Sequence, residues 1–487
     1  MQDLLCEEVF FCNDKECQVT ITLKFCGGAR TVTGSMHLLS VDRTHVLFDC
    51  GLFHGRRDEF YSVNSNFSFN PQNLAACVLS HAHIDHCGNL PTLIKKGYRQ
   101  HVFATPPTKE LCRYMLPDSG YVQEEDVKFV NKINKGKGIP PRSPLYTKPE
   151  AEAALKYVRS LEYHTRYALT REVDLTFFNS GHILGAAVPV FDIKTGTARP
   201  TRIAYAVDLG RYNMPLMRDP EAPKNVDYLI IESTYGARTH ASIEAAEDEL
   251  ADTITRTARR GGKVIIPSFA LERTQLIVYF INQLIRKNKI KKIPIYVDSP
   301  LAVNLTEVFR QNWEYFDEDI KQAYSHDDDI LGSDNINYVT SVDESKHLNE
   351  ETRPLIIISA SGMCENGRIL HHLKNNIENP NNTIVVVGFM AKETLGRRIV
   401  EREQTVKIFG HPYQLRAQVV TLNAFSSHAD KDGLVEYVKN FDDTLKKVFI
   451  VHGDEEQSEV LRTNLKKINL KVQVPAKDEI VFLAQAR

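Results

Sequence analysis

The sequence predicts an α/β protein of two units, in which a strand-rich unit is interrupted by an inserted unit with a parallel sheet. In the first half of the 487-residue chain, short apolar runs alternate with tight turns, which is typical of strands. After about residue 220, strands alternate with helices, which indicates a parallel sheet with helices on both faces. The chain is also longer than one ordinary domain.

The first half contains mostly strands, and one long helical stretch. Apolar residues alternate or cluster in five short segments, where we expect strands: 19–24, 37–41, 45–49, 173–179 and 203–208. The stretch 106–166 is charged and helical in pattern, with a break at 136–144. We therefore expect a strand-rich unit that contains one long helical segment.

The second half repeats strand and helix. We expect strands at 228–232, 263–267, 293–298, 354–359 and 383–389, and helices at 245–260, 272–287, 302–324 and 368–377. The last segment predicts strand, helix, strand and helix at 417–422, 432–440, 447–451 and 456–468. Because its loops carry further histidines, we assign this segment to the first unit.

The composition is that of a water-soluble enzyme, with 42% hydrophobic and 25% charged residues and a net charge of −2. A polyanionic substrate would therefore have to meet local positive charge. The nine cysteines form no disulfide pattern, which favours a reducing compartment. The chain shows neither a signal peptide nor an apolar run that could span a membrane, so we expect a cytoplasmic protein.

The segment His81-Ala82-His83-Ile84-Asp85-His86 follows an apolar run and places three imidazoles and a carboxylate within six residues. These groups are ligands of zinc and of other divalent metals. A strand leading into the segment could aim His81 and His83 to one side, while Asp85 and His86 lie in the following turn. Ligands divided in this way suit two adjacent metals better than one closed structural site.

This segment resembles the signature of the metallo-β-lactamase superfamily. The resemblance implies a third histidine ligand, a bridging aspartate and a late histidine, which correspond to His182, Asp208 and His452. His81, His83 and His182 would hold one metal, while Asp85, His86 and His452 would hold the other, with Asp208 shared. Asp49 matches an early aspartate that would orient a ligand rather than bind metal. We expect two Zn²⁺, although Mn²⁺ or iron would accept the same ligands.

Two further motifs indicate which family within this superfamily the chain resembles. Residues 232–236 (Glu-Ser-Thr-Tyr-Gly) and 423–430 (Asn-Ala-Phe-Ser-Ser-His-Ala-Asp), together with His452, are similar to three signatures of the β-CASP family. This family of nucleases includes the endonuclease subunit of the pre-mRNA cleavage machinery. The implied fold is a metallo-β-lactamase αββα sandwich with an inserted parallel-sheet β-CASP domain. We expect a tail at 1–18, the sandwich at 19–215 and 421–487, and the insert at 216–420.

The resemblance also implies the reaction, which is hydrolysis of phosphodiester bonds in single-stranded RNA by a hydroxide that two metals activate. The chain would be a zinc-dependent ribonuclease of RNA processing or decay, cutting internally, from the 5′ end, or in both ways. Asp85, Glu232 and His428 would be catalytic, with His428 protonating the leaving oxygen and Glu232 orienting it. His452 favours RNA, because the DNA-repair branch of the family usually carries valine there.

The inserted unit supplies candidate contacts to the substrate. Arg273, Ser361 and Arg397 lie in or near loops that follow predicted strands, where ligands bind in α/β sheets. Backbone N–H groups at the following helix starts would suit phosphate. The alternative is that these side chains only cap the helices.

Three alternative functions and two roles of one segment have to be weighed. The chain could be a DNA nuclease of the same family, or an RNA-binding subunit without activity. A small-molecule hydrolase is disfavoured, because the related hydrolases lack the insert and the Glu232 and His428 pair. The helical stretch 106–166 either walls the cleft or forms a contact between two copies of the chain, as in a homodimer.

Overall fold

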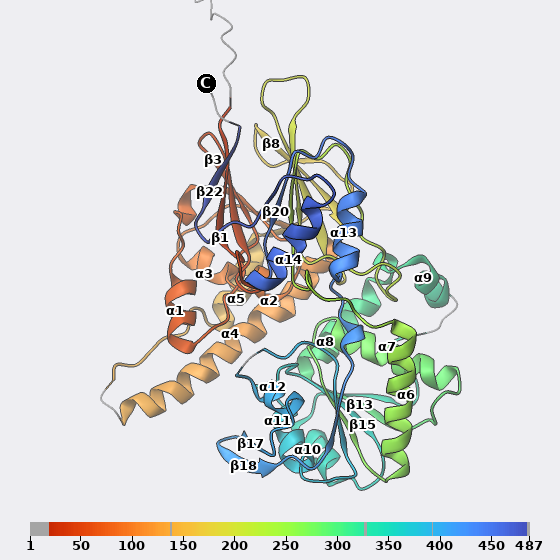
Figure 1. The fold of residues 1–487 in the computed structure, drawn as a ribbon. Helices are drawn as coiled ribbons and strands as arrows, with labels where there is room; N and C mark the ends of the chain where they lie inside the picture. Colours follow the sequence, from red (N-terminus) through yellow and green to blue (C-terminus); the bar gives the residue numbers. More distant parts are fainter. Residues whose placement is uncertain (1–18, 137–138, 326–328, 392, 485–487) are drawn as a thin grey trace, which may run out of the picture.

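The chain folds into two units, one above the other in Figure 1. The computed structural model describes residues 19–136, 139–325, 329–391 and 393–484, so the predicted tail at 1–18 lies outside the described residues. The upper unit holds two seven-stranded sheets, and the lower unit holds a six-stranded sheet.

The first sheet of the upper unit changes from antiparallel to parallel pairing at β3. The pairs from β22 to β3 are antiparallel, and those from β3 to β6 are parallel. In spatial order the strands are β22 (Ile480–Ala484), β1 (Ile21–Gly27), β2 (Met36–Val41), β3 (Thr44–Phe48), β4 (Leu74–Val78), β5 (Val102–Ala104) and β6 (Val158–Ser160).

The second sheet is mixed in the same way, with parallel pairs from β21 to β10 and antiparallel pairs from β10 to β7. Its order is β21 (Val472–Gln473), β20 (Lys447–Ile450), β11 (Tyr228–Ile231), β10 (Thr201–Ala206), β9 (Ala187–Ile193), β8 (Val173–Asn179) and β7 (Tyr167–Ala168). Strands β3, β8, β10 and β20 agree with the predicted positions to within a few residues.

The two sheets pack face to face through one apolar core. Phe48 from the first sheet stacks on Phe191 from the second, with ring centroids 4.0 Å apart, and Phe25 lies against Phe449. Burial of these side chains is the main driving force for the sandwich. The outer faces are covered by helices, with α2 (Ile84–Cys87), α3 (Leu90–Lys95), α4 (Pro106–Lys135) and α5 (Lys148–Ala154) on one side and α13 (Lys431–Lys439) and α14 (Glu455–Lys466) on the other. The predicted αββα sandwich is therefore confirmed.

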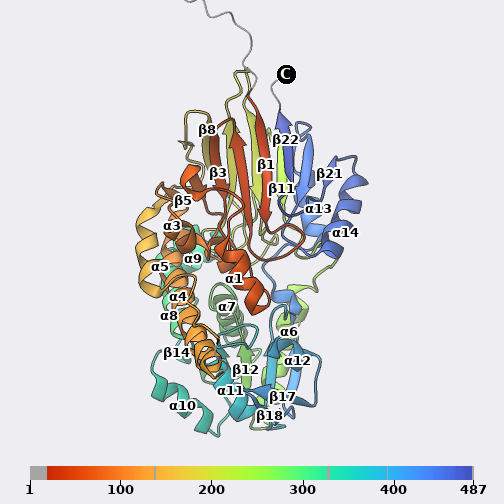
Figure 2. The ribbon, with the colours of Figure 1, turned by 90° about the vertical axis from the view of Figure 1, so that its left-hand side faces the viewer.

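The lower unit is an α/β layer around a wholly parallel sheet. Its order is β14 (Ile336–Val339), β13 (Ile295–Asp298), β15 (Ile356–Ser359), β12 (Val264–Pro267), β16 (Thr383–Val386) and β19 (Gln418–Thr421). Figure 2 shows helices around it, and these include α6 (Ile243–Arg259), α7 (Arg273–Arg286), α8 (Pro300–Gln311), α9 (Glu318–Ser325), α10 (Val342–Glu350), α11 (Ile369–Asn376) and α12 (Leu395–Val400). The parallel inserted sheet is as predicted.

Two strands lie in a different unit from the one we expected. β11 joins β10 and β20 in the sandwich, although we placed it in the insert, and β19 joins β16 in the insert, although we placed 417–422 with the final segment. β11 is a short apolar run and β19 a short edge strand with one buried residue, and neither pattern indicates which of two sheets receives the strand. The chain therefore passes from the sandwich into the insert after β11 and returns to the sandwich after β19.

The helical prediction at 106–166 is partly confirmed. The structure has α4, a break and α5, but the stretch then ends in the short strand β6. Strand β14, helix α10 and the hairpin of β17 (Thr405–Ile408) and β18 (His411–Gln414) were not predicted. No helix in the described ranges has both the length and the apolar character needed to cross a bilayer, and the six cysteines described there are buried without disulfides.

Candidate metal centre

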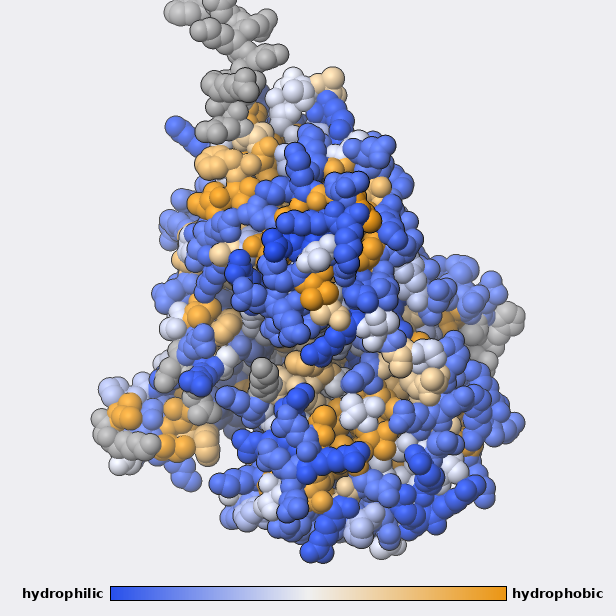
Figure 3. Space-filling view, in the orientation of Figure 1, coloured by the Kyte–Doolittle hydropathy of each residue, from blue (hydrophilic) through white to orange (hydrophobic). Residues whose placement is uncertain are grey.

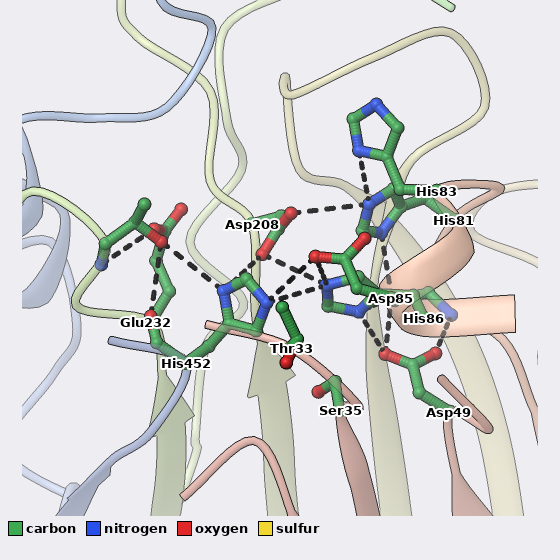
Figure 4. Close-up of polar contacts among 12 residues, drawn as sticks. Thr33, Ser35, Asp49, His81, His83, Asp85, His86, Asp208, Glu232 and His452 are labelled. Carbon is green, nitrogen blue, oxygen red and sulfur yellow. Dashed lines mark hydrogen bonds and ion pairs between the residues drawn. The ribbon is translucent and has the colours of Figure 1, made fainter. Parts of the chain in front are cut away.

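The predicted ligands lie together at the end of the sandwich that faces the insert, where several of its strands end. Asp49 follows β3, His81 follows β4 after two residues, Asp208 follows β10 and His452 follows β20. Asp85 and His86 lie in α2, and His182 lies in the loop after β8. Segments that are far apart in sequence therefore deliver their side chains to one place, as Figure 4 shows for most of them.

Three of these residues turn the chain sharply at strand ends. Asp49, Asp208 and His452 have φ values of 56°, 53° and 47°, in the left-handed region. Few residues other than glycine adopt this region, although aspartate and histidine do so more often than most. Such strained positions cluster at functional sites, where the surrounding structure holds them in place.

One group of ligands consists of His81, His83, His182 and Asp208. The Nε2 of His81 and the Nε2 of His182 lie 3.0 Å and 3.3 Å from Nδ1 of His83. Both Nε2 atoms lie 3.4 Å from Oδ2 of Asp208. These donor atoms form one compact set that could hold a metal ion.

The other group consists of Asp85, His86 and His452. The Nε2 atoms of His86 and His452 lie 3.1 Å apart, and Oδ2 of Asp85 is 3.5 Å from Nε2 of His452. Oδ1 of Asp208 lies 3.4 Å from Nε2 of His86 and 3.0 Å from Nδ1 of His452. The two carboxylate oxygens of Asp208 thus face different groups (Figure 4).

The chemistry of both groups fits divalent metals. Two nitrogen ligands at ~2.0–2.1 Å from a tetrahedral zinc are about 3.3 Å apart, close to the separations of the facing imidazole nitrogens. Burial, together with His81, lowers the pKa of His83 to about 3, and burial also lowers the pKa of His81 and His182. These imidazoles are therefore neutral, the form that binds metal. Oδ1 of Asp208 is buried and accepts no hydrogen bond from any described residue.

Asp49 supports the ligands from behind. Its Oδ2 lies 2.7 Å from Nδ1 of His86, and it accepts hydrogen bonds from the hydroxyls of Ser80 and Tyr205. The Ser80 backbone N–H donates to Oδ1 over 2.7 Å. This contact holds the ring of His86 with Nε2 facing the group, and the role of Asp49 in orienting a metal ligand stays a prediction. Ser80 and Tyr205 were not among the predicted residues, although Ser80 directly precedes His81.

Glu232 and His428 form a second feature beside the ligands. Nδ1 of His428 lies 3.1 Å and 3.2 Å from the two oxygens of Glu232, which also accepts from the Leu209 N–H. Burial lowers the pKa of His428, but Glu232 and Asp208 outweigh burial and raise it to about 9. The ring of His428 lies 4.4 Å from that of His182, centroid to centroid. A protonated imidazole is therefore held at the edge of the metal ligands.

Two contacts hold the loop of His428 against the residues that follow Asp208. Gly210 and His428 form an isolated bridge, and the Ala429 N–H donates to the Leu209 carbonyl. Thr234, which was not predicted either, places its hydroxyl 3.3 Å from Nδ1 of His452. It lies within the quoted 232–236 motif, which is the signal that could have revealed it.

The three predicted substrate contacts serve local structure in this conformation. Arg273 is only 8% exposed and donates to the Val387 carbonyl, which ties the loops after β12 and β16 together. Ser361 accepts from the Glu365 N–H, and Arg397 pairs with Glu401 at 2.7 Å. No hydrogen bond or ion pair joins these three side chains to the metal ligands within the described ranges. Their contact with substrate stays a prediction.

Three family models match consecutive parts of the chain. A metallo-beta-lactamase superfamily domain matches residues 38–213, and a Beta-Casp domain matches 274–399. A Zn-dependent metallo-hydrolase RNA specificity domain matches 412–475. The last model contains His428 and the predicted ligand His452, and the first contains the other six predicted ligands of the metals.

The chain also resembles named proteins over nearly its whole length. It is 34% identical over 431 residues to Ribonuclease TTHA0252 of Thermus thermophilus, which covers 88% of this chain and 93% of that protein. It is 30% identical over 478 residues to Transcription termination factor FttA of Methanosarcina mazei, covering 96% of this chain and 71% of that one. A crystal structure of a protein of unknown function from Enterococcus faecalis shares the fold, with a TM-score of 0.53, 12% identity, and coverage of 95% and 100%. The chain belongs to the β-CASP family of metallo-β-lactamase-fold ribonucleases.

Proposed function

We propose that this protein is a two-metal ribonuclease that hydrolyses single-stranded RNA during RNA processing or decay in the cytoplasm. The observation that carries the proposal is the Glu232 and His428 pair, which lies directly beside two groups of ligands that share Asp208. The RNA specificity domain matched at 412–475 supports RNA as the substrate.

The two ions would be held by His81, His83 and His182 on one side and by Asp85, His86 and His452 on the other, with Asp208 between them. When bound, such ions lower the pKa of water and neutralise phosphate charge. Zinc suits these ligands best, and Mn²⁺ or iron would also accept them.

The chain's own residues would control the proton that the leaving ribose oxygen needs. His428 is charged at neutral pH because the carboxylate of Glu232 stabilises its imidazolium. With Nδ1 held by Glu232, Nε2 is the atom that can donate. A general acid positioned in this way contributes about 10²- to 10⁴-fold in rate.

Cleavage of end-labelled single-stranded RNA tests the proposal. The protein is incubated with RNA and with DNA of the same sequence, labelled at either end, with Zn²⁺ or Mn²⁺. We expect RNA to be cut and DNA to stay intact, and the product lengths distinguish internal cutting from 5′ digestion. Equal cutting of DNA would favour a DNA nuclease, and binding without cutting would favour an RNA-binding subunit.

A further inference from the structure

Helix α4 carries exposed apolar side chains along one face, from Tyr114 to Ile133. Phe129 is 60% exposed, Tyr121 53% and Ile133 43%, and Tyr114 and Val122 are each 38% exposed. Tyr121 follows Tyr114 by seven residues, Phe129 follows Val122 by seven, and Ile133 follows Phe129 by four. These spacings place all five side chains on one side of a helix. We call these five residues the α4 stripe. A contiguous exposed apolar patch of this kind marks an interaction surface.

The opposite face of the helix is fully used by the protein's own fold. Val127 and Val130 are buried, and the side-chain amide of Asn131 exchanges two hydrogen bonds with the backbone of Arg142. The helix therefore does not need the stripe for its own packing. In Figure 1 its C-terminal end projects from the body, and Figure 3 shows apolar residues at this projection.

Acidic and basic side chains occupy different parts of α4. Glu124 and Glu125 precede Lys128, Lys132 and Lys135, so the helix changes from acidic to basic around Phe129. If two copies pair antiparallel, Glu125 of one copy faces Lys132 of the other, and the two-fold symmetry repeats the pair. The surface pair of Glu125 and Lys128, at 2.6 Å, is the weak kind that can rearrange.

We propose that the α4 stripe is a self-association surface, on which a second copy of this chain binds through its own α4 in antiparallel orientation. The stripe supplies apolar side chains at coiled-coil spacing, and Val122 and Phe129 occupy equivalent positions seven residues apart. Glu125 and Lys132 flank them and set the register. A charge pattern that changes sign along the helix complements its own reverse, whereas an RNA strand would require a uniformly positive track.

Sedimentation of the full-length protein tests this inference. We expect wild-type protein to form dimers, and Phe129→Glu to raise the dimer Kd at least about tenfold, as for a central interface residue. Phe482→Glu is the matched control, because Phe482 is 59% exposed on β22 and should leave the dimer unchanged. Thermal melting of both variants should match that of wild type, since neither side chain is buried.

A charge exchange tests the orientation. Glu125→Lys alone should weaken the dimer, and adding Lys132→Glu should restore it. A wild-type protein that stays monomeric, or a dimer that Phe129→Glu leaves intact, would overturn the proposal. The proposal would also be overturned if Phe129→Glu weakened the binding of single-stranded RNA while sedimentation did not change.

Discussion

The Nε2 atoms of His86 and His452 lie 3.1 Å apart, although 366 positions separate the two residues in the sequence. Two facing imidazole nitrogens at this distance need either a shared proton or a shared cation. Oδ1 of Asp208 is close to both rings and Asp85 lies opposite, so these carboxylates would stabilise positive charge between the two nitrogens. This contact joins the histidine-rich segment 81–86 to the loop that follows β20 of the second sheet.

Substitution of His452 should remove one metal and not the other. We expect His452→Ala to lower the metal content from two ions per chain to one and to abolish most cleavage of RNA, because His81, His83 and His182 remain intact. Metal analysis of dialysed protein by mass spectrometry measures this. His164→Ala, at an exposed histidine paired with Glu221, is the control. Two retained ions would remove His452 from the ligands.

Asp49→Asn should weaken metal binding without removing a ligand. The amide keeps the shape of the side chain but loses the charge that fixes His86, and substitutions of such supporting groups cost about 10- to 100-fold in metal affinity. Competition with a chromophoric chelator measures the affinity. Asp42→Asn, which changes an exposed acceptor for the Thr20 N–H, should leave it unchanged. An unaltered affinity in Asp49→Asn would contradict the supporting role.

Loss of His428, the proposed general acid, should separate catalysis from metal binding. We expect His428→Ala to keep both ions and to lose about 10²- to 10⁴-fold in cleavage rate. Glu232→Gln should also slow cleavage, because it removes the charge that raises the pKa of His428. Rates on labelled RNA and metal content are measured on the same samples. Normal cleavage by His428→Ala would exclude it as the proton donor.

His37 should make the protein less stable in acid. It is buried between Phe25 and Tyr205, and neither ring nitrogen has a hydrogen-bond partner among the described residues. Burial lowers its pKa to about 3 in the folded protein, against about 6.5 when unfolded. Protonation therefore favours the unfolded chain, and the free energy of unfolding falls as the pH drops below about 6.5.

The size of this effect can be measured on metal-free protein, in which protons do not compete with metal. Between pH 7 and pH 5 the His37 contribution to the free energy of unfolding should fall by about 2 kcal/mol. His37→Phe, which keeps the volume, should remove this part of the acid sensitivity. An identical pH dependence of urea unfolding in the variant and in wild type would show that His37 is not buried in its neutral form.

Site residues could be predicted from the sequence where their local spacing or a motif identifies them. His81 to His86 identify metal ligands by their spacing alone, whereas His182, Asp208 and His452 required the family resemblance, because single residues at strand ends carry no such signal. Tyr205 and Ser80 act through contacts with Asp49 that arise only when β3, β4 and β10 meet. Arg273 was expected to contact substrate, and nothing in the sequence shows that its side chain is buried beneath the loops.

The fold was predictable to a similar degree. Strand positions follow from apolar runs, but strand pairing does not, which is why β11 and β19 were placed in the wrong units. The hairpin of β17 and β18 was missed because both strands are only four residues long and β18 is mostly exposed and polar.

The most direct test of the account is a titration of metal-free protein with Zn²⁺, and in parallel with Mn²⁺, while bound metal and cleavage of labelled single-stranded RNA are both measured. The account predicts that cleavage appears only as the protein takes up two ions per chain, and that Asp208→Ala neither binds two ions nor cuts RNA. Full cleavage by metal-free protein, or a protein that binds two ions and leaves RNA intact, would contradict it.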